Sequence, residues 1–137
     1  MGTRSTIALE FADGTVQQIY CHWDGYLEHN GKILSEHYMD PFKVRDLINL
    51  GGFSSLDKTV EETAATAYTQ RGETKQVEKF IDFEDYVDNH QYEEYEYILR
   101  QVDGKAVWFV AEHGNNYVEL GSAIMDEQDR IAQEETE

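Results

Sequence analysis

A chain of 137 residues with a hydrophobic fraction of 40% is long enough to fold as one domain, and 12% aromatic residues are too many for a disordered acidic chain. Its 28 Asp and Glu against 11 Lys and Arg give a net charge of -17. This argues against direct binding to DNA or RNA, because phosphates are neutralised by Lys and Arg.

The first predicted element is a β-hairpin. Residues 5–11 and 15–23 are rich in β-forming side chains, and Asp13-Gly14 between them is a turn signal. Residues 25–30 are expected to form a loop. Apolar residues from Ile33 to Tyr38 then recur at helical spacing and predict a short helix.

The most clearly bounded helix is expected after Asp40, which stands where an N-cap belongs, with Pro41 at the first helical position. Val44, Leu47 and Ile48 would share one face, and Gly51-Gly52 would end the helix. Residues 53–59 read as a loop.

The second half of the chain alternates between strand and helix signals. Residues 64–68 predict a strand leading into a turn at 70–74, and residues 77–87 a helical or partly helical stretch. Residues 95–102 and 106–111 flank Asp103-Gly104 and predict a second hairpin. A final amphipathic piece would place Leu120, Ile124 and Ile131 on one side.

These elements predict an α+β fold in which antiparallel β-hairpins pack with two to three short helices, with an acidic C-terminal half. Residues 1–127 would form a single domain, and residues 128–137 a frayed acidic tail. No apolar run approaches the roughly 20 residues needed to span a bilayer. Cys21 is the only cysteine, which excludes an intramolecular disulfide. The two features together predict a cytoplasmic protein without a membrane partner.

Several short motifs carry a resemblance to known proteins. They are the start Met1-Gly2-Thr3-Arg4-Ser5-Thr6-Ile7, the run Ile19-Tyr20-Cys21-His22-Trp23-Asp24-Gly25-Tyr26, and then Gly31-Lys32-Ile33-Leu34, His37-Tyr38, Ala67-Tyr68 and Arg71-Gly72-Glu73. Over roughly its first 75 residues the chain resembles a family of small, mostly uncharacterised proteins of bacteriophages and prophage-bearing bacteria. The resemblance implies a phage-derived protein in the host cytoplasm rather than a housekeeping enzyme, and it carries no activity.

The segment from Cys21 to Asp24 is a candidate enzyme, ligand or metal site. Because neighbours on a strand point to opposite faces, Cys21 and His22 cannot form a nucleophile and base pair, so a structural role is favoured: Cys21 as a small buried hydrophobe and Trp23 as a core anchor. A metal site from His22, Asp24, His29 and His37 matches no compact ligand spacing. We therefore predict no catalytic residue, no metal and no cofactor.

The acidic segment, residues 78–96, is the other candidate. It holds eight acids and one base, Lys79, and Asp82, Asp85 and Asp88 recur every third residue. On a helix such a row has about 5 Å between successive charges, comparable to the spacing of DNA phosphates. The alternative is a solvated helix face. The residues expected to bind a partner are Asp82, Glu84, Asp85, Tyr86, Asp88, Tyr92, Glu93, Glu94, Tyr95 and Glu96, with Tyr97 as a further tyrosine among the acids.

The favoured hypothesis is a non-enzymatic phage-type inhibitor that acts as an acidic DNA mimic. Its partner would be a basic host DNA-binding protein, such as a nuclease, restriction or recombination enzyme, so the function would be evasion of host defence (anti-restriction). One alternative is a small enzyme or a ligand- or metal-binding domain centred on Cys21-His22-Trp23-Asp24, and another is a generic protein-interaction module. The sequence leaves homo-oligomerisation open.

Overall fold

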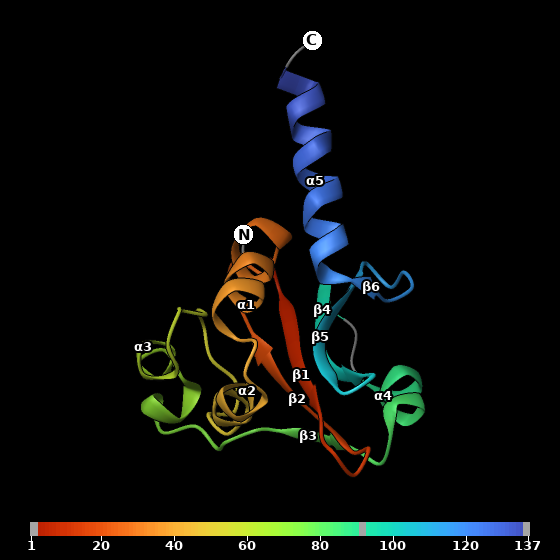
Figure 1. Ribbon diagram of the computed structural model, residues 1–137. Helices are drawn as coiled ribbons and strands as arrows, with labels where there is room; N and C mark the ends of the chain where they lie inside the picture. The colour runs from red at the N-terminus through yellow and green to blue at the C-terminus, as the bar shows by residue number, and fades with distance from the viewer. Residues whose placement is uncertain (1–2, 91–92, 136–137) are drawn as a thin grey trace.

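A six-stranded mixed sheet, with helices against both of its faces, organises the protein (Figure 1). The computed structural model describes residues 3–90 and 93–135. The strands follow the order β3-β2-β1-β4-β5-β6 across the sheet. They are β1 (Ser5–Glu10), β2 (Val16–Cys21), β3 (Glu78–Phe80), β4 (Tyr95–Val102), β5 (Lys105–Glu112) and β6 (Val118–Glu119). The predicted α+β class is confirmed.

Both predicted hairpins are confirmed, and their turns show why the sequence marks them. Between β1 and β2, the Thr15 amide donates a hydrogen bond of 3.0 Å to the Asp13 carboxylate, and Gly14 has a φ of 90°. Between β4 and β5, Asp103 and Gly104 have φ values of 51° and 78°. Two successive positive φ values match the right-handed twist of the flanking strands, which is why Asp-Gly favours this turn.

The sheet is mixed rather than built of antiparallel pairs alone, which corrects the expected architecture. Strands β1 and β4 run parallel, with Ser5 opposite Tyr95 and Leu9 opposite Leu99, and this contact joins the two hairpins. The other neighbouring strands are antiparallel. A parallel contact between segments this far apart has no local turn signal, so the sequence pattern does not reveal it.

The predicted helices of the first half are confirmed as α1 (Lys32–His37) and α2 (Pro41–Ile48). The Asp40 carboxylate accepts a 2.9 Å hydrogen bond from the Phe42 amide, and Gly51, with a φ of 74°, follows the helix end. The expected loop at 25–30 instead contains a short π-helical turn, η1 (Leu27–Gly31).

The predicted strand at 64–68 is wrong. Thr59 caps α3 (Val60–Ala64) by accepting a hydrogen bond from the Glu62 amide while its own hydroxyl donates to the Glu62 carboxylate. This cap starts a helix that ends at Ala64, the first residue of the expected strand. Turn-type hydrogen bonds follow, from the Thr66 amide to the Thr63 carbonyl and from the Ala67 amide to the Ala64 carbonyl, and Ala67 keeps only one isolated bridge, with Phe53. A 3-10 turn, η2 (Tyr68–Arg71), follows.

The stretch at 77–87 is helical only in its second part, as α4 (Phe83–Asn89), because residues 78–80 form edge strand β3. The last helix, α5 (Leu120–Glu135), continues through the expected domain boundary between residues 127 and 128 and extends beyond the sheet (Figure 1). The described residues therefore contain five α-helices, more than the two to three expected. None of them is both long enough and apolar enough to cross a membrane.

Two apolar cores lie on opposite faces of the sheet because side chains alternate along each strand. The larger core joins Ile7, Leu9 and Ile19 to α1, α2 and the start of α5. The smaller core joins Ala8, Val16 and their neighbours to α4. We call the face that carries the smaller core the α4 face, and the candidate sites lie on it.

Candidate functional site

The acidic segment begins with carboxylates that stabilise the start of α4. Asp82 is the N-cap, and its side chain accepts a 2.8 Å hydrogen bond from the Asp85 amide. The Asp85 side chain accepts hydrogen bonds from the Ile81 amide and from the Asn89 side chain. Negative charge is favourable at a helix N-terminus, so Asp82 and Asp85 stabilise the start of α4, whereas Asp88 lies near its C-terminal end.

The exposed and partly exposed carboxylates of this segment form no ion pair among the described residues, although the charge of Arg4 acts on Glu93. Asp82, Glu84 and Asp88 are exposed, and Asp85, Glu93, Glu94 and Tyr95 are partly exposed. Among the described residues, no Lys, Arg or His nitrogen lies within 4.0 Å of a carboxylate of Asp82, Glu84, Asp85, Asp88, Glu93 or Glu94. Tyr92 lies outside the described residues.

Tyr86 and Glu96 are buried, so the structure removes them from the expected binding surface. Glu96 points from β4 onto the α4 face and pairs with His90, whose other ring nitrogen contacts the Tyr86 carbonyl oxygen. Tyr117 donates a 3.2 Å hydrogen bond to the Tyr86 hydroxyl. Tyr97 is also buried, because it faces the larger core and donates to the Gly25 carbonyl oxygen. Of the described tyrosines named in the expected site, only Tyr95 keeps partial exposure.

The His90–Glu96 pair sets the ionisation of the imidazole. Burial lowers the pKa of His90, but the hydrogen bond and the negative charge of Glu96, with the Tyr86 carbonyl, outweigh burial and raise that pKa above its usual value. The pair therefore favours an imidazolium inside the protein. Since both side chains are enclosed, its role is structural in this conformation.

Cys21 is buried, as the sequence analysis expected of a structural residue. Burial raises the pKa of its thiol to about 11, which leaves little of the nucleophilic thiolate near neutral pH. The Asn30 side chain donates to its sulfur at 3.5 Å. The expected core position of Trp23 is wrong: 42% of that residue is exposed, because the strand ends at Cys21 and the chain turns at Asp24, whose φ is 57°.

The four residues considered as metal ligands form no site. His22 shares a 2.9 Å hydrogen bond with the Tyr20 hydroxyl, and His29 contacts the Asn30 side chain. Within residues 3–90 and 93–135, no three His, Cys, Asp or Glu side chains are grouped closely enough to hold a metal ion.

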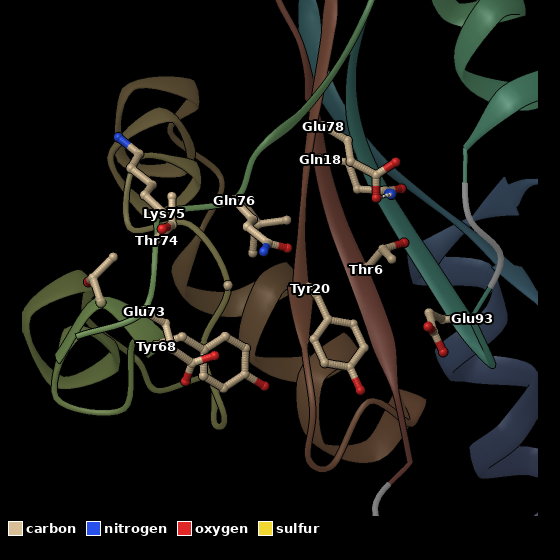
Figure 2. A pocket seen from close by; sticks show the side chains of 13 residues that line it. Thr6, Gln18, Tyr20, Tyr68, Glu73, Thr74, Lys75, Gln76, Glu78 and Glu93 are labelled. Carbon is tan, nitrogen blue, oxygen red and sulfur yellow. Dashed lines mark hydrogen bonds between the residues drawn. The ribbon is translucent and has the colours of Figure 1, made fainter. Parts of the chain in front are cut away.

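A cavity of about 330 Å³ opens on the α4 face beside the acidic segment. Figure 2 shows Thr6, Gln18 and Tyr20 on its floor, the segment 68–76 on one side and Glu93 on the other. The floor residues share a face because Thr6 stands opposite Tyr20 and Gln18 comes two residues before Tyr20 on β2. We call this cavity the Gln18 pocket.

The wall of the Gln18 pocket depends on Gly52. The Tyr68 amide donates to the Gly52 carbonyl oxygen, and a Cβ at Gly52 would lie 2.9 Å from the Tyr68 ring. A side chain at position 52 would therefore displace this ring. The Tyr68 ring lies 6.5 Å from that of Tyr20, centroid to centroid, with 28° between their planes.

One buried polar atom of a residue that lines the Gln18 pocket has no partner among the described residues. The Gln18 side-chain nitrogen donates to the Glu78 carboxylate at 3.3 Å, which leaves its oxygen unpaired, whereas the neighbouring Thr6 hydroxyl interacts with the Tyr86 side chain. These residues are only 2% and 3% exposed. An unsatisfied buried polar group costs about 1–3 kcal/mol, so the unpaired Gln18 oxygen beside this cavity indicates that solvent or a ligand completes its hydrogen bond.

The sequence analysis missed this pocket. Thr6 and Gln18 follow the polar alternation of an ordinary solvent-facing strand surface, and only the path of residues 68–76 encloses them. Comparison of the chain with family models, curated proteins and solved structures finds no match. The resemblance of its first part to phage proteins therefore stays a prediction.

Proposed function

We propose that this protein is a non-enzymatic acidic inhibitor that occupies the basic groove of a host DNA-binding protein and keeps DNA out of it. The observation that supports this most is the absence of neighbouring cations: the described Lys, Arg and His residues neutralise none of the outward carboxylates of the acidic segment within 4.0 Å. Those carboxylates are left to pair with Arg and Lys of a partner, the groups that otherwise hold phosphates.

The charge of the whole chain supports the same function. A net charge of -17 accelerates encounter with a basic protein and opposes contact with nucleic acid. The carboxylates that serve this role best are Glu84 and Asp88, which are exposed on α4, whereas Asp82 and Asp85 are engaged in capping.

An apolar contact is available beside these charges. Ile81 is 77% exposed and immediately precedes the capping residue of α4. Interfaces gain much of their affinity from such apolar anchors, while charges at the rim set the association rate and the partner. Ile81 thus replaces the buried Tyr86 in the binding surface.

The test is competition with DNA. Partners are captured from host lysate at low salt, eluted at high salt and identified, and each captured DNA-binding protein is then mixed with labelled duplex in a mobility-shift assay. We expect the acidic protein to release the duplex, less effectively as salt rises, because exposed charges are screened over about 8–10 Å near physiological ionic strength. Direct binding of the isolated protein to the duplex would contradict the proposal.

A matched pair of variants locates the surface. Glu84→Gln with Asp88→Asn removes two exposed charges from α4, and Glu28→Gln with Glu36→Gln removes two exposed charges from η1 and α1. We expect the first pair to weaken competition and to make its salt dependence shallower, and the second to do so much less. Equal effects would mean that overall charge, not the acidic segment, drives binding.

A further inference from the structure

The Gln18 pocket has the chemistry of a site for a ligand that donates hydrogen bonds. Its unpaired amide oxygen can only accept, and the Glu78 and Glu93 carboxylates at its edge also only accept when ionised. The Thr6 hydroxyl can donate or accept, so it does not oppose such a ligand. A guanidinium presents five N–H donors and no acceptor, which satisfies this arrangement.

The charge around the pocket favours a cation. Glu73 is already paired with Arg71, but Glu78 and Glu93 have no cation within 4.0 Å among the described residues. The Lys75 side chain extends away from Thr6 and Gln18 (Figure 2). Burial raises the pKa of Glu93, the positive charge of Arg4 opposes that shift, and a cation brought into the pocket would further favour the charged form.

The aromatic rings favour a flat cation over a compact one. Tyr20 and Tyr68 both border the cavity, and the guanidinium carbon of Arg71 already lies 4.7 Å from the centre of the Tyr68 ring. One face of the Tyr68 ring is therefore covered by Arg71 of the chain itself, which leaves Tyr20 and the other face of Tyr68 for a bound cation. Arginine stacks on aromatic faces and forks onto carboxylates in ways that the ammonium of lysine cannot.

We propose that the Gln18 pocket binds the guanidinium of an arginine side chain that the basic partner protein inserts between Tyr20 and Glu93. This inference rests on the proposed function for the source of the arginine, and on the pocket alone for its chemistry. The cavity of about 330 Å³ accommodates the planar group with part of its aliphatic stem.

The experiment titrates the full chain with Nα-acetyl-arginine N-methylamide and follows its backbone amides by NMR. The matched probes are the corresponding blocked citrulline, which keeps the shape without the charge, and blocked lysine. We expect the arginine probe to bind with a dissociation constant on the order of 1 mM and to shift amides of β1, β2 and residues 68–76. Equal binding of citrulline or lysine, or no binding, would overturn the proposal.

Variants of neighbouring glutamines give the control. Gln18→Met removes the unpaired oxygen while it keeps the length of the side chain, and Gln17→Met makes the same change on the opposite face of β2. We expect Gln18→Met to weaken binding about tenfold, equivalent to about 1.4 kcal/mol, and Gln17→Met to leave it unchanged. Folding of both is checked from their amide spectra. If Gln18→Met folds and binds like the parent, the pocket is not the site.

Two further comparisons separate this inference from the proposed function. Free arginine that binds more tightly than the blocked residue would overturn the assignment to a partner protein and indicate a small metabolite. If the acidic protein displaces DNA from its partner but Gln18→Met competes equally well, the pocket proposal fails alone. If the arginine probe binds and no DNA is displaced, the inhibitor function fails and the guanidinium site stands.

Discussion

The buried His90–Glu96 pair predicts that one substitution reverses the contribution of a histidine to the pH dependence of stability. Glu96→Gln keeps the shape of the side chain and removes its charge. In the parent, the raised pKa of His90 means that the folded state holds the proton more tightly than the unfolded chain. That stabilisation is complete below the ordinary histidine pKa of 6.5 and is lost as the pH rises through the raised value.

The variant should behave in the opposite sense. Without Glu96, burial is the main effect on His90 and lowers the pKa of the imidazole. The contribution of His90 to the stability of the folded state is then lost as the pH falls through 6.5. Breaking a buried ion pair costs about 3–5 kcal/mol. We expect Glu96→Gln to lose about 3 kcal/mol of folding free energy near pH 6, because His90 can release its proton and become neutral. The difference between parent and variant should shrink toward pH 9, at no more than about 1.4 kcal/mol per pH unit for one proton.

The groups that face His90 allow this titration to be followed. Tyr86 stacks on its ring with 4.3 Å between centroids, Tyr117 lies near its Nε2, and Glu78 adds a weaker negative charge. Urea unfolding of both proteins at steps between about pH 6 and pH 9 gives the free energy difference at each pH. The exposed Glu36, 4.0 Å from a nitrogen of His37, supplies the control, and Glu36→Gln should cost about 0–1 kcal/mol. A difference for Glu96→Gln that stays constant across this range would refute the reasoning.

Three other substitutions test separate features. Cys21→Ala should cost about 1 kcal/mol in urea unfolding, and iodoacetamide should label native Cys21 much more slowly than the unfolded chain, because the thiol is buried with a pKa of about 11. Asp82→Ala should cost about 1 kcal/mol through loss of the α4 cap, whereas the exposed Glu84→Ala should stay within about 0.5 kcal/mol; equal costs would argue against the cap. Gly25→Ala should lower the melting temperature markedly, because its new Cβ would lie 2.7 Å from the Cβ of Ser5; an unchanged melting temperature would show that β1 yields there.

Local signals explain which elements could be predicted. Asp40-Pro41 and Asp103-Gly104 specify a helix start and a hairpin turn through bonds within a few residues, and both are confirmed. The segment 64–68 was predicted wrongly because the helix that Thr59 caps ends at Ala64 and the chain then turns, with only one isolated bridge at Ala67. The parallel contact of β1 with β4 depends on tertiary packing, which no local pattern encodes.

The candidate sites also combine features that the sequence predicts with features that depend on tertiary packing. The charge of the acidic segment is visible in the sequence, and so is the exposure of Glu84 and Asp88. The burial of Tyr86 and Glu96 is not, because it depends on α4 packing against the sheet and on the contact with Tyr117. The Gln18 pocket was unpredictable for a related reason, since its floor and its wall come from segments about 50 residues apart and meet only in the folded chain.

The parallel contact between β1 and β4 has a consequence for the order of synthesis. As the nascent chain leaves the ribosome, the β1–β2 hairpin emerges early, but Tyr95 follows Ser5 by 90 positions, the difference of their residue numbers. Until then one edge of β1 lacks its neighbour, and an unpaired strand edge is prone to pair with other chains. Contacts of such long range close slowly. Residues 1–70 hold ten Asp and Glu against five Lys and Arg, a net charge of -5, so nascent chains repel one another only modestly until the more acidic second half is made.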